Sequence, residues 1–258
     1  MLTAERRQRI LEEVENRNSI SVTELCHLLS VSDMTIRRDL RALSDEGMLE
    51  RVHGGALARR DRSNELPYFI RSTENIHQKK IIGQRAADYV HDGDSIALDI
   101  GTTTLELAKA MVGIRNLTVL TSNLLVVEVL KEAPNIRLVI SGGELRFEEF
   151  SLVGPLAQRT FKEFRIDKAF LSAGGLDLIK GLTDYNQQDI QVKQALITHA
   201  NLVIAMIDSS KFGVVYDHVF APLSMVDYLI TDEEAPLEGL DQLTLDGIEV
   251  IVAEKERV

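Results

Sequence analysis

The sequence predicts an α/β protein: an N-terminal winged helix-turn-helix followed by a C-terminal, doubly wound, mostly parallel α/β domain. Two short helical segments joined by a link of a few residues, with arginines on the second, indicate the first part. Short apolar strands that alternate with helical segments from residue 95 onward indicate the second part. We expect the winged helix over residues 1–58, a linker and connecting helix over 59–90, and the α/β domain over 91–258.

The composition is that of a globular protein whose charge is unevenly distributed. The 258 residues carry a net charge of −11, yet residues 1–62 hold 11 arginines and 11 acidic side chains and are neutral. An acidic protein can still bind a polyanion if its cations gather on one face. No apolar run approaches the roughly 20 residues of a membrane span, and Cys26 is the single cysteine. We therefore expect a cytoplasmic protein with no membrane segment and no disulfide framework.

The second of the two helices has one apolar face and one basic face. Ser32 supplies an N-cap hydroxyl, Gly47 is suited to end the helix, and Ile36, Leu40 and Leu43 recur at helical spacing. On the opposite side lie arginines that could reach base edges or phosphates in a major groove. A solvated charged face would give the same pattern, and for this helix alone that alternative stays open.

The flanking segments favour a DNA-binding unit. Helices are expected over residues 3–16 and 22–29, a strand over 48–52, and the His53-Gly54-Gly55-Ala56 turn would reverse this strand into a wing. Together these elements predict a winged helix that binds double-stranded operator DNA. The candidate DNA contacts are Ser32, Met34, Thr35, Arg37, Arg38, Arg41, His53 and Gly54.

The remaining chain is expected to build a sheet with ligand-binding turns at one edge. A helix is expected over about 73–90, with Pro67 as the first residue of a segment before it. Five strands end in turns rich in Gly, Ser, Thr or Asp, and in a doubly wound sheet the carboxyl ends of the strands line the ligand crevice. The expected strands are 95–100, 117–120, 136–140, 169–172, 202–207, 228–230 and 249–252.

One of these turns has the composition of an anion cradle. Gly101-Thr102-Thr103-Thr104 would begin a helix, where backbone N–H groups and the helix dipole favour phosphate or carboxylate. Asp99 is placed to accept from ligand hydroxyls, and Lys193 and Lys211 could add positive charge. Such a turn alone is more often merely a helix start, but several turns converge. The candidate effector contacts are Asp99, Gly101, Thr102, Thr103, Thr104, Thr121, Asn123, Gly142, Gly143, Lys193, Asp208 and Lys211.

The motifs resemble a known family. The segments over residues 3–14 and 21–56, which contain TIRRDL and HGGA, are similar to the N-terminal domain of DeoR-family bacterial transcriptional repressors, and the resemblance continues to the C-terminus. Residues 95–211 also resemble ribose-5-phosphate isomerase in the GTTT, TSN, LIKG and IDSSK pieces. This resemblance implies a phosphorylated sugar as effector of a carbohydrate-operon repressor. Because a single winged helix makes few DNA contacts, we also expect a homodimer or homotetramer that reads repeated half-sites.

The resemblance to the isomerase does not extend to the positions of its catalytic residues. The acid-rich turn of that family is replaced by residues 172–177, and its catalytic glutamate position is filled by Val192, which cannot accept a proton. The six histidines show no metal spacing, so we expect no cofactor and no enzymatic activity. Two alternatives stay open: a sugar-phosphate isomerase carrying a DNA-binding domain, and an activator with the same architecture.

Overall fold

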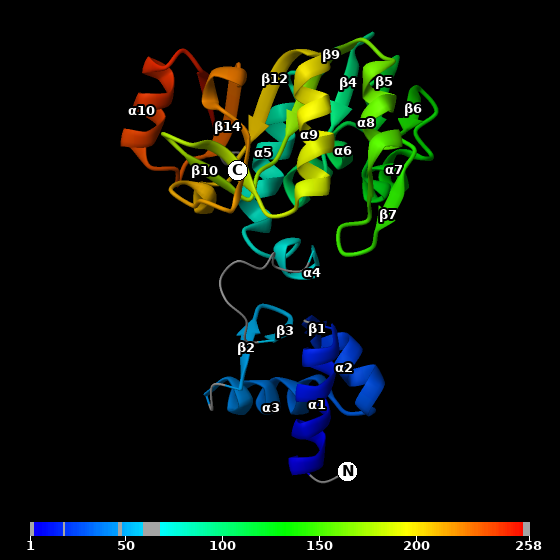
Figure 1. Ribbon diagram of the computed structural model, residues 1–258, viewed down its shortest axis with the longest axis vertical. Helices are drawn as coiled ribbons and strands as arrows, with labels where there is room; N and C mark the ends of the chain where they lie inside the picture. The colour runs from blue at the N-terminus through cyan, green and yellow to red at the C-terminus, as the bar shows by residue number, and fades with distance from the viewer. Residues whose placement is uncertain (1–2, 18, 46–47, 59–67, 255–258) are drawn as a thin grey trace. The chain divides into compact units, whose positions relative to one another are not determined.

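The computed structural model describes residues 3–17, 19–45, 48–58 and 68–254 (Figure 1). The chain forms two compact units, Met1–Glu74 and Asn75–Val258. The helix expected over residues 73–90 therefore belongs to the second unit, where it runs from Ile76 to Ala87. Gly47 and Pro67, for which helix-terminating and helix-starting roles were expected, lie outside the described residues.

The first unit is a three-helix winged helix. Helix α1 spans Thr3–Arg17, α2 spans Val22–Leu29 and α3 spans Asp33–Asp45. Ser21 and Glu24 form a capping box at the start of α2, with Ser21 Oγ accepting from Glu24 N at 3.1 Å. Apolar side chains of all three helices share one core. The short helix α4 (Tyr68–Arg71) follows.

The wing contains one strand more than the sequence predicted. Strands β2 (Leu49–Val52) and β3 (Gly55–Ala58) form the expected hairpin, and β1 (Ser19–Ser21) pairs with the other edge of β3. A three-residue strand shows too little alternation to stand out in a sequence. Its central residue, Ile20, lies opposite Ala56 and is buried, so β1 ties the wing to the core between the helices.

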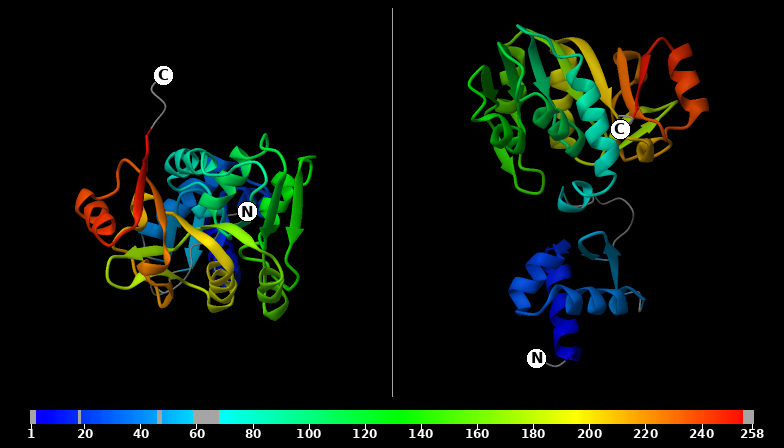
Figure 2. Two further views of the ribbon diagram at one scale, coloured as in Figure 1. Left: turned by 90° about the horizontal axis from the view of Figure 1, so that it is seen from above. Right: turned by 180° about the vertical axis from the view of Figure 1, so that it is seen from behind.

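The second unit is built on a seven-stranded sheet in the order β15-β14-β12-β9-β4-β5-β6, with every neighbouring pair parallel. The doubly wound parallel architecture is thus confirmed. Helices cover both faces: α8 and α9 lie in front of the sheet in Figure 1, and α5 lies in front when the molecule is seen from behind (Figure 2). The strands are β4 (Ser95–Leu98), β5 (Leu117–Thr121), β6 (Ile136–Ile140), β9 (Ile166–Leu171), β12 (Ala200–Met206), β14 (Tyr228–Asp232) and β15 (Glu249–Ala253). The helices are α5 (Ile76–Ala87), α6 (Thr102–Ala110), α7 (Leu124–Leu130), α8 (Pro155–Lys162), α9 (Gln187–His199) and α10 (Leu237–Leu245).

The strand order reverses at β4. From β4 the chain proceeds to β5 and β6 on one side, then returns to place β9 against the other side of β4 and continues outward through β12, β14 and β15. Loops leaving the carboxyl ends of β4 and β9 therefore diverge to opposite faces. Such a switch point is where ligands bind in open α/β sheets.

Smaller antiparallel elements, not expected from the sequence, lie beside the main sheet. A hairpin is formed by β7 (Glu144–Arg146) and β8 (Ser151–Val153), and a three-stranded sheet by β10 (Gly175–Asp177), β11 (Gly181–Asp184) and β13 (His218–Ala221). Single-turn 3₁₀ helices span Ser209–Lys211 and Leu223–Met225. Across the described residues, no helix has both the length and the apolar character needed to cross a membrane.

Candidate functional site

Helix α3 presents the expected two faces. Ile36, Leu40 and Leu43 are buried in the core of the first unit, as the apolar spacing predicted. Met34 is 80% exposed, and Arg38 and Arg41 are also exposed. Neither of these arginines forms an ion pair with a described residue.

Arg37 differs from the other two arginines. Its Nε and Nη2 donate to the two carboxylate oxygens of Asp33 at 2.6 and 3.1 Å, one helical turn earlier. This contact lowers the pKa of Asp33 and raises that of Arg37. An exposed i,i+4 pair contributes little stability, but it orients Arg37 along the helix. Arg38 and Arg41 therefore carry the uncompensated charge of this face.

Between the arginines and the core lies a buried ion pair that the sequence analysis did not identify. Asp39 is fully buried, and its Oδ2 accepts from Arg6 Nε at 2.6 Å while Oδ1 accepts from Arg7 Nε at 3.4 Å. Arg6 is thus held inside the unit. Asp39 lies three residues after Ile36 and four before Leu43, so its place on the apolar stripe was a signal that could have revealed it.

The wing turn is anchored to the helices. Gly54 has a φ of +90°, which favours glycine, and its carbonyl accepts from Val22 N at 2.8 Å. His53, just before it, is exposed. The turn is thus held in place by the first residue of α2, and the imidazole of His53 lies on the surface.

In the second unit, the loops after β4 and β9 meet at the switch point. The backbone N–H of Ser172 donates to Asp99 Oδ2 at 3.1 Å, and Ser172 Oγ donates to the carbonyl of Ile100 at 2.7 Å. Gly101 has a φ of +139°, and a Cβ there would lie 2.1 Å from Ser172 Oγ. Only glycine fits between the two loops, which explains the residue that precedes the three threonines.

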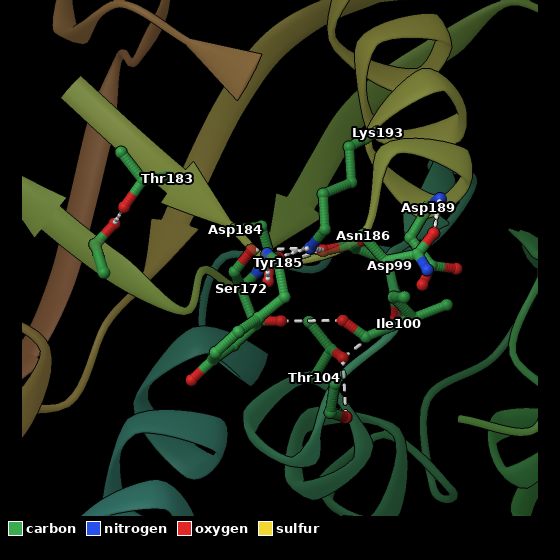
Figure 3. A network of polar contacts seen from close by, with 12 residues as sticks. Asp99, Ile100, Thr104, Ser172, Thr183, Asp184, Tyr185, Asn186, Asp189 and Lys193 are labelled. Atoms are coloured by element: carbon green, nitrogen blue, oxygen red, sulfur yellow. Dashed lines mark hydrogen bonds and ion pairs between the residues drawn. The ribbon is translucent and has the colours of Figure 1, made fainter. Parts of the chain in front are cut away.

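A buried lysine holds this junction together (Figure 3). Lys193 Nζ, from α9, forms ion pairs with Asp99 Oδ2 and, at 3.2 Å, with Asp184 Oδ2, and donates to the carbonyl of Ser172 at 2.8 Å. Lys193 and Asp99 are each 1% exposed. Sequence analysis selected both residues as ligand contacts, but it missed Ser172 and Asp184. The structure brings all four together, and the charge of Lys193 is already balanced by carboxylates.

The ionisation of this group follows from burial and from the pairing. Burial raises the pKa of Asp99 to about 6, although the ammonium of Lys193 favours the ionised carboxylate. Burial also opposes the charged form of Lys193, but Asp99 and Asp184 outweigh it and raise its pKa. The lysine therefore stays charged at neutral pH.

The turn over residues 101–104 begins α6, as the sequence predicted. Leu105 N donates to the carbonyl of Gly101 at 3.2 Å as the first hydrogen bond of the helix, which leaves the N–H groups of Thr102, Thr103 and Thr104 without helical partners. Thr104 Oγ1 donates inward to the carbonyls of Asp99 and Gly101 at 2.9 and 3.1 Å. Thr104 thus shapes the turn, whereas the three N–H groups lie at the positive end of the helix dipole.

The other candidate residues lie along the same edge of the sheet. Thr121 Oγ1, at the end of β5, donates to the carbonyl of Leu98 at 2.9 Å, and Asn123 Oδ1 caps α7 by accepting from Leu125 N at 2.9 Å. Gly143 has a φ of +136°, and a Cβ there would lie 2.4 Å from the carbonyl oxygen of Val153, so it is required by the β7–β8 hairpin. Gly142 follows β6 with only ordinary contacts.

The last two candidate residues lie in the turn after β12. Asp208 is buried and accepts from Ser210 N at 3.2 Å and from Asn75 Nδ2 at 3.4 Å, just before α5. Lys211 is half-buried within the following 3₁₀ turn and is in no ion pair with a described residue. No group of three or more His, Cys, Asp or Glu among the described residues could hold a metal ion.

Comparisons with known proteins agree across both units. The family model of the DeoR-like helix-turn-helix domain matches residues 6–62, and the family model of the DeoR C terminal sensor domain matches residues 74–233. An uncharacterized HTH-type transcriptional regulator, YulB, of Bacillus subtilis is 39% identical over 250 residues, covering 96% of this chain and 94% of its own. The glycerol-3-phosphate regulon repressor of Escherichia coli is 32% identical over 244 residues, covering 95% and 96%.

Among solved structures, ribose 5-phosphate isomerase A from Methanocaldococcus jannaschii aligns with 54% of this chain and 55% of its own at 17% identity and a TM-score of 0.41. The two family models together match most of the sequence, and both relatives align with it over nearly their full length. The chain belongs to the DeoR family of helix-turn-helix transcriptional regulators.

Proposed function

We propose that this regulator represses a carbohydrate-metabolism operon and leaves its operator when a phosphorylated sugar or a related metabolite binds the second unit. The observation that carries the proposal is the pairing, in one chain, of a recognition helix with uncompensated arginines and a sheet edge where buried polar groups converge at the switch point. Relatives that are named repressors, of the glycerol-3-phosphate regulon and of the aga operon, support the direction of control.

On the DNA side, Arg38 and Arg41 would contact base edges or phosphates in the major groove. Met34, on the same face of the helix, would face the floor of the groove. Both arginines are exposed and pair with no residue in the described part of the chain, which supports this assignment. Ser32, Thr35, Arg37, His53 and Gly54 would contact the backbone around them. One winged helix covers few base pairs, so a symmetric dimer or tetramer would read repeated half-sites.

On the effector side, the phosphate would bind the three free N–H groups at the start of α6. The charges of Asp99 and Lys193 already compensate each other. These two residues would therefore hold the loops that surround the ligand in place. Thr121, Asn123, Gly142 and Gly143 would line one side of the crevice, and Asp208 and Lys211 the other. A ligand releases DNA only to the extent that it binds the DNA-free arrangement more tightly.

We propose further that the chain does not catalyse isomerisation. Val192, at the position expected for a catalytic carboxylate, is 3% exposed and packs in the core on the α9 face of the sheet. Aldose–ketose exchange needs a base beside the substrate carbon. The binding arrangement would thus serve regulation alone.

The test uses the full chain and a duplex selected from a random pool for tight binding. Fluorescence anisotropy would follow release of the duplex while sn-glycerol 3-phosphate, ribose 5-phosphate, fructose 1-phosphate and glucose 6-phosphate are added separately. We expect one compound to release the DNA and to raise the melting temperature of the second unit. At 100 times its Kd this compound should add about 2.7 kcal/mol to the free energy of unfolding of that unit. NMR of the same mixtures should show no conversion, and sedimentation should give a dimer or tetramer. Release of DNA by none of these compounds would refute the proposed effector class.

A further inference from the structure

Three polar side-chain atoms beyond the ends of β5 and β6 are buried without a hydrogen-bond partner in the described structure. They are Ser122 Oγ, Asn123 Nδ2 and Ser141 Oγ, in residues that are each at most 3% exposed. A buried polar group that has lost water and gained no partner costs about 1–3 kcal/mol. Proteins keep such groups where a ligand, an ion or an ordered water completes them.

The three residues that carry these atoms lie on neighbouring segments of the backbone. Ser141 N donates to the carbonyl of Thr121 at 2.9 Å, so the segments that follow β5 and β6 lie side by side. The β7–β8 hairpin lies next to them, because Leu152 N donates to the carbonyl of Ser122 at 2.8 Å and Asn123 forms a β-bridge with Ser151. The region is therefore the part of the sheet edge that lies on the β5 side of the α6 N-terminus.

The chemistry of this region differs from that of the α6 cradle. Asn123 Oδ1 is occupied by the α7 cap, so Nδ2 can only donate, whereas a serine hydroxyl can donate or accept. The cation on the adjacent hairpin, Arg146, is paired with the buried Asp189, which also accepts from Ser151 Oγ at 2.9 Å. The described residues of the hairpin thus offer no uncompensated positive charge to a second anion, and the three polar atoms suit neutral oxygens.

We propose that Ser122, Asn123 and Ser141 form a subsite for the uncharged end of the effector, where hydroxyl or carbonyl oxygens complete their hydrogen bonds. This inference rests on the proposed function, in which the phosphate lies at the start of α6. Adjacent strands lie about 4.8 Å apart, so a ligand that reaches from the β4 end to the β5 and β6 ends spans about 5–10 Å. A five- or six-carbon sugar phosphate has this length, whereas the three-carbon glycerol phosphate reaches less of it.

The test separates the cost in the free protein from the gain on binding. Ser122→Ala and Ser141→Ala remove hydroxyls that have no partner, so in ligand-free full-length protein the urea midpoint of the second unit should stay the same or rise. Thr121→Val removes a hydroxyl that bonds to Leu98 and should lower this midpoint. Thr231→Val removes another buried hydroxyl without a partner, on β14, and serves as the control for position.

Calorimetric titration with ribose 5-phosphate, fructose 1-phosphate, glucose 6-phosphate and sn-glycerol 3-phosphate then measures binding. Each serine variant should weaken the binding of a five- or six-carbon compound about tenfold and leave that of glycerol 3-phosphate nearly unchanged. Thr231→Val should bind like the wild type. Wild-type affinity in both serine variants would overturn the subsite while sugar-phosphate binding stands. A drop in their urea midpoints like that of Thr121→Val would also overturn it, since the hydroxyls would then be satisfied within the protein. A wild type that binds none of the four compounds refutes the proposed function and the subsite with it.

Discussion

Replacing Asp39 by alanine should unfold much of the DNA-binding unit although the residue lies within the recognition helix. Asp39 has no exposed surface, and Arg6, whose side chain is 8% exposed, donates to it at 2.6 Å. Removal of the carboxylate leaves a buried guanidinium without its principal partner, which typically costs about 3–5 kcal/mol. A unit of this size has about 3–10 kcal/mol of stability in total. The substitution therefore removes between about a third and all of this stability.

Scanning calorimetry of the full chain would measure the effect. The transition of the first unit should fall by more than about 10 °C, and operator binding should be lost with it, while the transition of the second unit stays in place. Glu13→Ala is the matched control: it removes the partner of Arg17 at 2.8 Å on the surface of α1, where an i,i+4 pair contributes only about 0.3–0.5 kcal/mol. If Asp39→Ala lowers the transition no more than Glu13→Ala does, the buried pair does not hold α1 against α3 and the reasoning is refuted.

Three further predictions follow from single residues. Arg38→Ala should weaken operator binding by about 1–3 kcal/mol in anisotropy titrations with no change in melting, and equal affinity would remove Arg38 from the interface. Because the pKa of Asp99 is raised to about 6 in the folded state from 3.8, the folded protein binds this proton more tightly, and its contribution to stability falls by about 2 kcal/mol as pH rises from 4 to 6. Urea unfolding should show this loss in the wild type but not in Asp99→Asn, and parallel pH curves would contradict it. Gly83→Val should destabilise the second unit by about 1–3 kcal/mol in the same assay, since even a Cβ would lie 2.7 Å from the backbone of Glu106; an unchanged midpoint would show that α5 and α6 can separate.

The elements with strong periodicity were predictable from the sequence. The spacing of Ile36, Leu40 and Leu43 set the buried face of α3, and the apolar segments from residue 95 onward gave the parallel strands of the main sheet. The turn after β4 could also be recognised, because Gly101 and the threonines that follow form a helix start with its own chemistry. These features are local, because each is determined by residues that are close together in the sequence.

Features that depend on distant parts of the chain were not predictable. Lys193 and Asp99 are 94 positions apart, and nothing near either residue indicates that the two charges neutralise each other. Asp184 was missed because β11 is one of several three- or four-residue strands whose pairing is set by neighbours rather than by alternation. The same holds for the hairpin that covers Ser122, which carries no two-residue turn signature in the sequence.

The contacts of Asp99 at the switch point also bear on whether this residue could act as a catalytic base. A pKa of about 6 would by itself suit a general base at neutral pH, so the value alone favours catalysis by Asp99. Geometry opposes it: Asp99 Oδ2 already accepts from Lys193 Nζ and from Ser172 N, and the carboxylate is 1% exposed. A base must reach a substrate carbon, and withdrawing Asp99 for that purpose would leave a buried ammonium with Asp184 alone. Since breaking a buried ion pair costs several kcal/mol, the network stabilises the junction of the loops after β4 and β9, and this stabilisation opposes a role of Asp99 as a base.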